Sequence, residues 1–330
     1  MTYTNKIKTI KFSILFILII FLSFLSYLNY SLNKNILTEN KLFYIKKGES
    51  LSKSINRLKK ENIFNSELRI KIISYMLFLK PKFISGKYRI TKSDTEYSLL
   101  IKVLKGNLYQ ESFTIIEGST FSKIISDLIN SNYINSDNYK KVSLIKNDFQ
   151  KNKPNLEGLC FPDTYSFSSN IKIEDFFLLC SSKMEKILME NWITRDKSLP
   201  YKNPYDLLIM ASIIEKETSI KSEKPFVASV FINRLNNKMR LQADPTVIYG
   251  IKNFDGNITK KHLREKNDYN TYRIYGLPIS PICSPGEASI KAASNPQKTN
   301  YLYFVANDNG EHIFSKNYDD HLKAVNKFQK

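Results

Sequence analysis

A strand–glycine–helix pattern occurs twice in the chain, and this repeat constrains the fold more than any other feature of the sequence. The first copy runs from Phe43 to Ser66, and the second runs from Phe113 to Ser136. Aligned without a gap, the copies share Phe, Ile, Gly, Ser-Lys, Ile, Leu, Asn and a closing Asn-Ser. In each copy an alternating apolar segment predicts a short strand, and apolar residues at helical spacing after the glycine predict a helix. The sequence therefore predicts two βα units of similar build.

The turn and the start of the helix are marked in both copies. Gly48 and Gly118 stand at the turn, while Ser50 and Thr120 stand where a helix N-cap is expected. Units of this kind resemble LysM-type modules, which are associated with polymers of N-acetylglucosamine. A generic βα unit repeated for packing fits the pattern equally well. We group residues 40–143 as a LysM-like region, and the polar stretch that follows, Leu144 to Asn155, suits a domain boundary.

An apolar run without any charge, Phe12 to Leu28, precedes this region and is near the shortest length at which a helix spans a bilayer. Three lysines come before it, so the positive-inside rule places residues 1–11 in the cytoplasm. A cleaved signal peptide is the alternative, but no small-x-small cleavage site follows the run. We expect residues 12–30 to form one transmembrane helix in the inner (cytoplasmic) membrane. The rest of the chain would then lie on the periplasmic, or outer, face.

The formal net charge of +19 over 330 residues raises the question of a nucleic-acid partner. The lysines, however, are spread along the whole chain among Asn and Ile, and no Arg-rich patch is present. A hydrophobic content of 42% argues against a disordered basic tail and for buried cores. We therefore expect no nucleic-acid partner.

The cysteines and histidines do not form a recognisable ligand pattern. No CxxC pair occurs, and the histidines lack metal-ligand spacing. We therefore expect ordinary structural roles for them, with no disulfide framework, no metal and no cofactor. The residues concerned are Cys160, Cys180, Cys283, His262, His312 and His321.

A helix that can carry an acid is expected to start at Asn203 and Pro204, which suit the N-cap and the first helical position. On a helical wheel Glu217 lies roughly 50° from the centre of the apolar face, and Glu215 lies about 110° from it. A carboxyl group at the edge of an apolar face loses water, its pKa rises, and it can act as a general acid. Glu217 fits this role better than Glu215, although a glutamate near a helix end is more often solvated or salt-bridged.

Polar and aromatic side chains gather in the segments around this helix. The QADPT element supplies hydrogen-bonding groups of the kind that hold a sugar, and the Tyr-rich segment from Tyr269 to Ala293 suits stacking on sugar rings. Those tyrosines could equally form the aromatic core of a small sheet. A β-hairpin is expected within Asn300 to His321, turning at Asn307 to Gly310. The predicted substrate-binding residues are Glu157, Asp163, Gln242, Asp244, Thr246, Tyr269, Asn270 and Tyr272.

Several consecutive blocks between Leu156 and Lys330 resemble the MltG (YceG-like) family of endolytic murein transglycosylases. They are EGLCFPDTY, MASIIEKET, VASVFINRL, MRLQADPTVIYG, YNTY, GLPISPICSPG with SIKAA, and YLYFVAND with the H-I-F that follows. Many blocks in the family's order make the resemblance specific. One departure is Leu159-Cys160, where bulkier aromatic residues are usual in the family, and this pair could alter the lining of the cleft.

The resemblance implies a reaction and its participants. The catalytic Glu of the EKET block corresponds to Glu217, which would protonate the glycosidic oxygen between N-acetylmuramic acid and N-acetylglucosamine. The muramic C6 hydroxyl would then attack C1 and give a 1,6-anhydro end, without water or metal. Peptidoglycan glycan strands are the implied substrate, and cell-wall synthases are the implied partners.

The fold that we expect is α+β, with a single N-terminal transmembrane helix, the LysM-like βα region and a mixed α/β catalytic domain over 155–330. Two other functions stay open. One is a non-catalytic peptidoglycan-binding scaffold of the wall-synthesis machinery. The other is a glycan hydrolase, which would need a second carboxylate, with Asp163 and Asp244 as the candidates.

Overall fold

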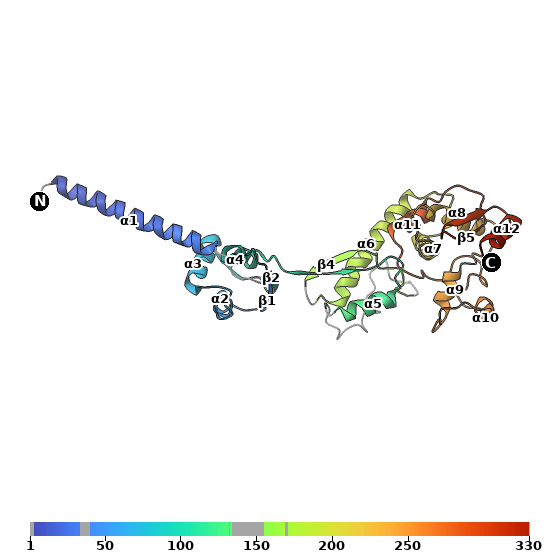
Figure 1. Ribbon diagram of the computed structural model, residues 1–330, viewed down its shortest axis with the longest axis horizontal. Helices are drawn as coiled ribbons and strands as arrows, with labels where there is room; N and C mark the ends of the chain where they lie inside the picture. The colour runs from blue at the N-terminus through green and yellow to red at the C-terminus, as the bar shows by residue number, and fades with distance from the viewer. Residues whose placement is uncertain (1–2, 34–39, 132, 134–154, 169–170, 330) are drawn as a thin grey trace. The chain divides into compact units, whose positions relative to one another are not determined.

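The structure, a computed structural model, describes residues 3–33, 40–131, 133, 155–168 and 171–329 (Figure 1). It is a mixture of helices and short paired strands, which confirms the expected α+β class. The chain forms two compact units. Unit 1 comprises Met1–Glu111 with Phe167–Ser169, and unit 2 comprises Ser112–Ser166 with Asn170–Lys330.

The N-terminal residues form a single long helix, α1 (Tyr3–Leu32), whose large apolar side chains from Phe12 to Leu22 are exposed. Within the described part of the chain, none of the helices combines the length and the apolar character that a membrane crossing requires. The transmembrane helix that the sequence predicted at residues 12–30 is therefore not supported by the structure.

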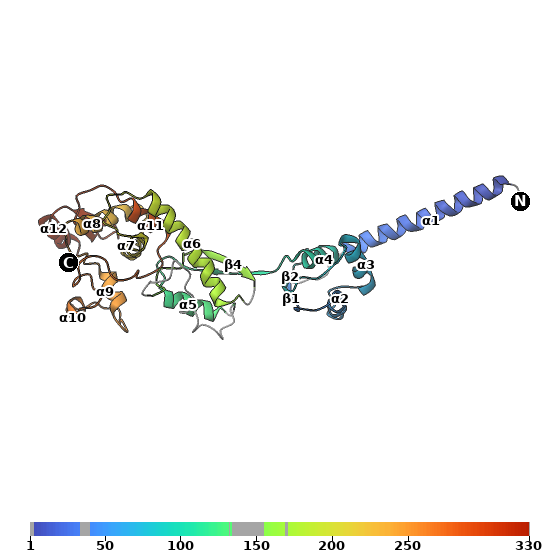
Figure 2. The ribbon, with the colours of Figure 1, turned by 180° about the vertical axis from the view of Figure 1, so that it is seen from behind.

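The remainder of unit 1 is a two-stranded antiparallel sheet covered by three helices (Figures 1 and 2). Phe43 pairs with Tyr88 across the sheet, and their rings stack with centroids 5.4 Å apart. In chain order the elements are β1 (Lys41–Ile45), α2 (Leu51–Lys60), α3 (Glu67–Leu77), β2 (Gly86–Ile90) and α4 (Glu96–Lys105).

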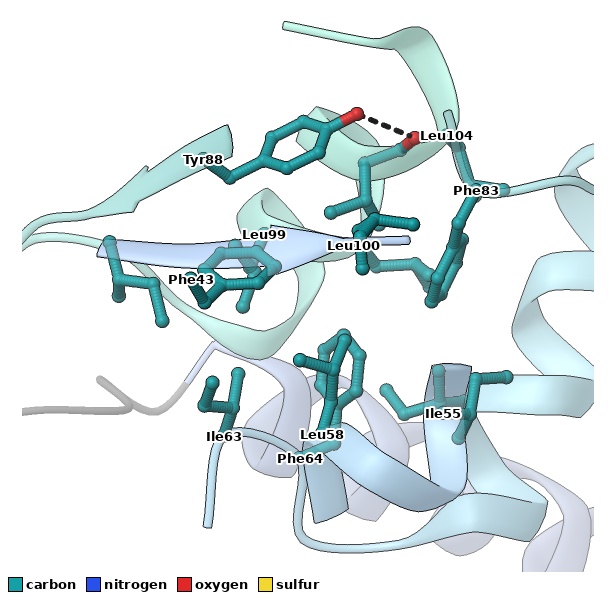
Figure 3. Close-up of a cluster of buried hydrophobic side chains, with 14 of the residues drawn as sticks. Phe43, Ile55, Leu58, Ile63, Phe64, Phe83, Tyr88, Leu99, Leu100 and Leu104 are labelled. Atoms are coloured by element: carbon teal, nitrogen blue, oxygen red, sulfur yellow. Dashed lines mark hydrogen bonds between the residues drawn. The ribbon is translucent and has the colours of Figure 1, made fainter. Parts of the chain in front are cut away.

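The core of unit 1 lies between the sheet and these helices (Figure 3). Leu58 from α2, Tyr88 from β2 and Leu99 from α4 are all completely buried. The Tyr88 hydroxyl, at the edge of this apolar cluster, donates to the Ile84 carbonyl oxygen at 2.7 Å. Full burial of a leucine-sized side chain contributes about 2 kcal/mol, so this cluster is the main apolar contribution to the stability of the unit.

Unit 2 is built around helix α7, which packs against α6, α8 and α11. β4 pairs with β3, and β5 pairs antiparallel with β6 in the hairpin that the sequence predicted. The elements that lie wholly or mainly in unit 2 are β3 (Gln110–Thr114), α5 (Phe121–Asn130), β4 (Thr164–Ser168), α6 (Ile173–Thr194), α7 (Pro204–Glu217), α8 (Lys224–Asn236), α9 (Asp244–Gly250), α10 (Lys260–Arg264), α11 (Glu287–Ser294), β5 (Tyr303–Ala306), β6 (His312–Ser315) and α12 (Tyr318–Phe328).

Both copies of the sequence repeat form a strand, a glycine turn and a capped helix. The side chains of Ser50 and Thr120 accept hydrogen bonds from the backbone three residues later, so both predicted N-caps are confirmed. Gly48 and Gly118 have φ values of 79° and 76°, a left-handed conformation that glycine adopts at no steric cost.

The two copies nevertheless belong to different cores. The first lies in unit 1, whereas helix α5 of the second copy lies in unit 2. There the Phe121 ring packs edge-to-face on the Phe177 ring of α6, with the ring centroids 4.9 Å apart. The apolar face of α5 thus has its partner in the helix that follows it in sequence.

Some of the residues on which the sequence analysis relied lie outside the described part of the chain. These are the end of the second copy (residue 132 and residues 134–136) and most of the expected boundary stretch (residues 144–154). The LysM-like assignment of residues 40–143 stays a prediction.

The cysteines differ from expectation. Cys160 and Cys180 form a disulfide, with their Cα atoms 4.8 Å apart, so the expectation of no disulfide was wrong. The backbone N–H of Phe161 donates to the Cys180 carbonyl oxygen at 3.1 Å, which holds the loop against α6. Sequence spacing does not reveal this pair, because the contact depends on how that loop meets α6. Cys283 is a free, buried thiol.

Candidate active site

The site is built on the C-terminal turn of α7. Asn203 caps the helix by accepting hydrogen bonds from the N–H groups of Tyr205 (2.9 Å) and Asp206 (3.3 Å), and Pro204 occupies the first turn, as the sequence predicted. All residues from Leu207 to Ile214 are buried, so the helix is fixed on every side. Its last turn therefore projects its side chains from a rigid base.

Glu215 points into the protein and is fully engaged. Its carboxylate accepts hydrogen bonds from the Lys224 ammonium (3.0 Å), the Ser289 hydroxyl (2.6 Å) and the Gly286 backbone N–H (2.9 Å). The side chains of Glu215 and Lys224 are 7% and 2% exposed. Glu215 therefore ties α7 to α8 and to the N-terminus of α11, where a helix favours negative charge.

Glu217 has a different environment. Its side chain lines an open cavity of about 430 Å³, which we call the Glu217 cavity. Burial, and in second place the charge of Asp244, raise the pKa of Glu217 from an ordinary 4.5 to about 8. Among the described residues, no side chain or backbone N–H donates a hydrogen bond to its carboxyl group. A donor would favour the ionised form, so without one the carboxyl group holds its proton near neutral pH.

One further carboxyl group, that of Asp244, and one amide group, that of Gln242, line the same cavity. Asp244 begins α9 and accepts a hydrogen bond from the Tyr272 hydroxyl at 2.6 Å. Gln242, whose φ is 53°, accepts from the Arg234 guanidinium at 2.9 Å. These polar groups are thus held in place, and the side chains of Arg234, Gln242, Asp244 and Tyr272 all line the cavity with Glu217.

The β5–β6 hairpin and α12 complete the cavity, although no role in the site was predicted for their residues. His312 of β6 contacts Glu223 at 2.7 Å, and Glu223 also accepts from the Thr218 hydroxyl at 2.9 Å. Thr218 caps the C-terminus of α7 directly after Glu217. The hydrogen bonds from His312 through Glu223 to Thr218 therefore connect the hairpin to the end of the helix. The only sequence feature that pointed to this contact was the H-I-F segment, which contains His312 and belongs to the last sequence block of the family resemblance.

The remaining predicted substrate-binding residues lie outside the Glu217 cavity, where each has a partner within the protein. Glu157 accepts from the Phe121 N–H (2.8 Å) and the Tyr249 hydroxyl (2.9 Å). Asp163 forms an ion pair with Lys183.

The other three lie in α9 and in the segment after α10. Thr246 is fully buried and contacts the Thr271 hydroxyl at 2.8 Å. The Tyr269 hydroxyl contacts Ser280 at 2.8 Å. The Asn270 amide donates to the Glu265 carbonyl oxygen at 2.6 Å. Their contacts hold the segments that carry Gln242, Asp244 and Tyr272.

A carboxyl group that keeps its proton at neutral pH inside a polar cavity is equipped to protonate a leaving oxygen. Asp244, in the same cavity, supplies a negative charge that can stabilise a developing cation. Within the described residues, no group of three or more His, Cys, Asp or Glu side chains is arranged to hold a metal ion. The arrangement is therefore that of an acid–base site that can act on a glycosidic bond.

Comparison with known sequences agrees with this chemistry. The model of the YceG-like family matches residues 43–327. A Bacillus subtilis protein named endolytic murein transglycosylase is 35% identical over 308 residues, which cover 86% of this chain and 83% of that protein. A Streptococcus pneumoniae protein of the same name is 32% identical over 177 residues, or 52% of this chain and 32% of the longer relative.

Comparison with solved structures gives the same result. A crystal structure of a YceG-like protein from Listeria monocytogenes matches with a TM-score of 0.52 and 27% sequence identity. The match covers 87% of this chain and 99% of that protein. The fold is therefore shared over nearly the whole length of the Listeria protein.

Proposed function

The chain belongs to the YceG-like family, and from this membership and the Glu217 cavity we infer that it is an endolytic murein transglycosylase with Glu217 as its catalytic acid. The substrate is the peptidoglycan glycan strand. The single observation that supports the choice of Glu217 is the position of its carboxyl group in an open cavity, where burial raises its pKa to about 8.

The reaction needs one carboxyl group that acts twice. Glu217 first donates its proton to the glycosidic oxygen between N-acetylmuramic acid and N-acetylglucosamine, and the bond from that oxygen to C1 of the muramic residue breaks. An oxocarbenium-like C1 results, and the negative charge of Asp244 favours it. The Glu217 carboxylate then takes the proton of the muramic C6 hydroxyl as its oxygen bonds to C1. A 1,6-anhydro end forms, Glu217 is protonated again, and no water is consumed.

Glu215 is not a second candidate for the acid. Its carboxylate is the acceptor of an ion pair and two further hydrogen bonds, and it does not line the cavity. A proton on Glu215 would break these contacts. The two glutamates of the EKET block therefore divide into a structural residue and a catalytic residue.

A glycan hydrolase is the alternative that one observation favours, because Asp244 lines the Glu217 cavity and could serve as a second carboxylate. Asp163, the other residue considered for this role, is paired with Lys183 and does not line the cavity. The two reactions differ in product mass, since hydrolysis adds one water and transglycosylation adds none.

The decisive experiment incubates the full chain in detergent with purified peptidoglycan and weighs the products by mass spectrometry. Internal fragments that end in 1,6-anhydro-muramic acid are expected, and the Glu217→Gln variant should produce none. Reducing ends would establish a hydrolase. No products from folded protein would favour the non-catalytic scaffold.

The cellular location and the synthase partner are further proposals. We propose that the exposed apolar side chains of α1 hold the protein at the cytoplasmic membrane, with unit 2 on the outer face beside the cell-wall synthases. Membrane fractionation with and without residues 1–32 tests the location, and crosslinking in cells tests the synthase contact. Recovery of the full chain in the soluble fraction would contradict the membrane proposal.

A further inference from the structure

A second cavity, of about 490 Å³, lies beside the Glu217 cavity, and the mechanism makes no use of it. We call it the Lys216 cavity. All of its lining residues belong to unit 2. Those that matter here are Phe121, Glu157, Lys216, Pro245, Ile248 and Ile282.

The two cavities share a wall made of consecutive residues. At the end of α7, Lys216 lines one cavity and Glu217 lines the other. At the start of α9, Pro245 lines the Lys216 cavity and Asp244 lines the Glu217 cavity. Successive side chains on a helix point about 100° apart, so a single turn of α7 serves both spaces. The two cavities therefore open at neighbouring positions of α7 and of α9.

The lining of the Lys216 cavity suits a peptide better than a sugar. Pro245, Ile248 and Ile282 present aliphatic surface, whereas sugar rings stack on flat aromatic faces. Phe121 also lines the cavity, and its ring is engaged edge-to-face with the Phe177 ring, with centroids 4.9 Å apart. The one tyrosine in the lining, Tyr249, is fixed by its hydrogen bond to Glu157 and by an edge contact with the Tyr269 ring at 4.8 Å.

The charged side chains of the cavity indicate a ligand that carries a negative charge. Lys216 is exposed and has no ion-pair partner among the described residues. The only carboxyl group in the lining, Glu157, is committed to the Phe121 N–H and the Tyr249 hydroxyl. Burial raises the pKa of the Glu157 carboxyl group. Among the described residues that line the cavity, the charged group without a partner is therefore Lys216.

We propose that the Lys216 cavity binds the peptide stem carried by the muramic acid at the cleaved bond. Lys216 pairs with a carboxylate of the stem, and the aliphatic wall contacts its alanine methyl groups. This inference rests on the proposed function, because the stem enters only if the glycan strand occupies the Glu217 cavity. Binding of the stem in the Lys216 cavity makes the enzyme selective for strands that still bear their peptides.

The test compares two substrates: glycan strands with peptide stems, and the same strands after an amidase has removed the stems. The full chain should have a higher kcat/KM on the peptide-bearing strands. Lys216→Ala should lower the ratio of the two kcat/KM values about fivefold, the size expected for one partly exposed ion pair. Ile248→Trp should lower the same ratio by filling the cavity. Lys291→Ala, which removes an exposed lysine of α11 that lines neither cavity, is the matched control.

Each outcome decides the proposal. An unchanged ratio in Lys216→Ala, an equal loss on both substrates, or a wild-type enzyme that does not distinguish them would overturn the peptide site and leave the transglycosylase intact. Full activity of Glu217→Gln on both substrates would instead overturn the proposed function. A ratio that falls in Lys216→Ala and Ile248→Trp but not in Lys291→Ala supports the peptide site.

Discussion

The two sides of the last turn of α7 carry the same side chain in opposite settings. Glu215 faces Lys224 and the N-terminus of α11, where three donors stabilise its charge. Glu217, two residues later, lines an open cavity and accepts no hydrogen bond from any described residue, and burial raises its pKa to about 8. The difference shows that the role of each carboxyl group is set by what surrounds it, since both stand on the same rigid helix. Glu215 should therefore govern stability, and Glu217 should govern catalysis.

The largest expected effect is the loss of activity in Glu217→Gln. Removing the acid should lower kcat by about 10²- to 10⁴-fold, the usual contribution of general acid–base catalysis. The thermal midpoint should not fall, because glutamine replaces a carboxyl group that is already uncharged. Turnover of peptidoglycan and a thermal melt on the same sample measure both. A variant that unfolds instead would show that Glu217 is structural and would remove the contrast with Glu215.

The second prediction is a loss of stability when Glu215 is replaced. Glu215→Gln leaves the Lys224 ammonium buried without its counter-charge, which should cost roughly 3–5 kcal/mol of unfolding free energy. Replacing both partners, in Glu215→Leu with Lys224→Met, should cost less than Glu215→Gln alone, since no unpaired charge remains. Urea denaturation of both variants gives the comparison. Equal losses in both would mean that the ion pair does not set the stability of this turn.

A pH profile sharpens the contrast, since the raised pKa of Glu217 lies near neutrality. The protonated form of Glu217 is present below its pKa of about 8, so kcat/KM should fall as pH rises through about 8. Asp244→Asn removes the neighbouring charge and should move this fall to lower pH. The movement should be smaller than the shift caused by burial, which is the main cause. Asp175→Asn, an exposed position on α6, is the control and should leave the profile unchanged.

The same pKa has a consequence for stability. Between about 4.5 and about 8 the unfolded chain has lost the Glu217 proton while the folded chain keeps it. Unfolding free energy should therefore fall as pH rises across this window, and Glu217→Gln should remove that fall. A pH dependence identical in the variant and the wild type would mean that the pKa of Glu217 is not raised.

Much of this site could be predicted from local sequence. The N-cap at Asn203, the apolar face of α7 and the position of Glu217 at the edge of that face all follow from residues close together in the chain. The glycine turns and caps of the repeat, at Ser50 and Thr120, are local in the same sense.

Contacts between distant segments were not predictable in this way. The partner of Glu215 on α11 is 74 residues away, and the contact between His312 and Glu223 spans 89 residues. The Cys160–Cys180 disulfide depends on how a loop meets α6. The α5 helix looked like a second copy of α2, yet its apolar face packs in the core of unit 2. Periodicity identifies an apolar face but does not identify the surface that covers it.

The smallest effect that we predict concerns the contact that joins the catalytic turn to the hairpin. Burial opposes ionisation of Glu223, but hydrogen bonds from His312 and Thr218 outweigh it and lower its pKa below the usual 4.5. Stability from this group is thus present above about pH 4.5 and is lost as pH falls through the lowered pKa. Glu223→Gln should cost about 1 kcal/mol at neutral pH, lower kcat a few-fold by loosening the His312 wall, and weaken the acid-side loss of stability. Thermal melts between pH 3 and 7 (roughly the range in which carboxyl groups titrate) measure this. An unaltered kcat alongside the stability loss would confine the contact to a structural role.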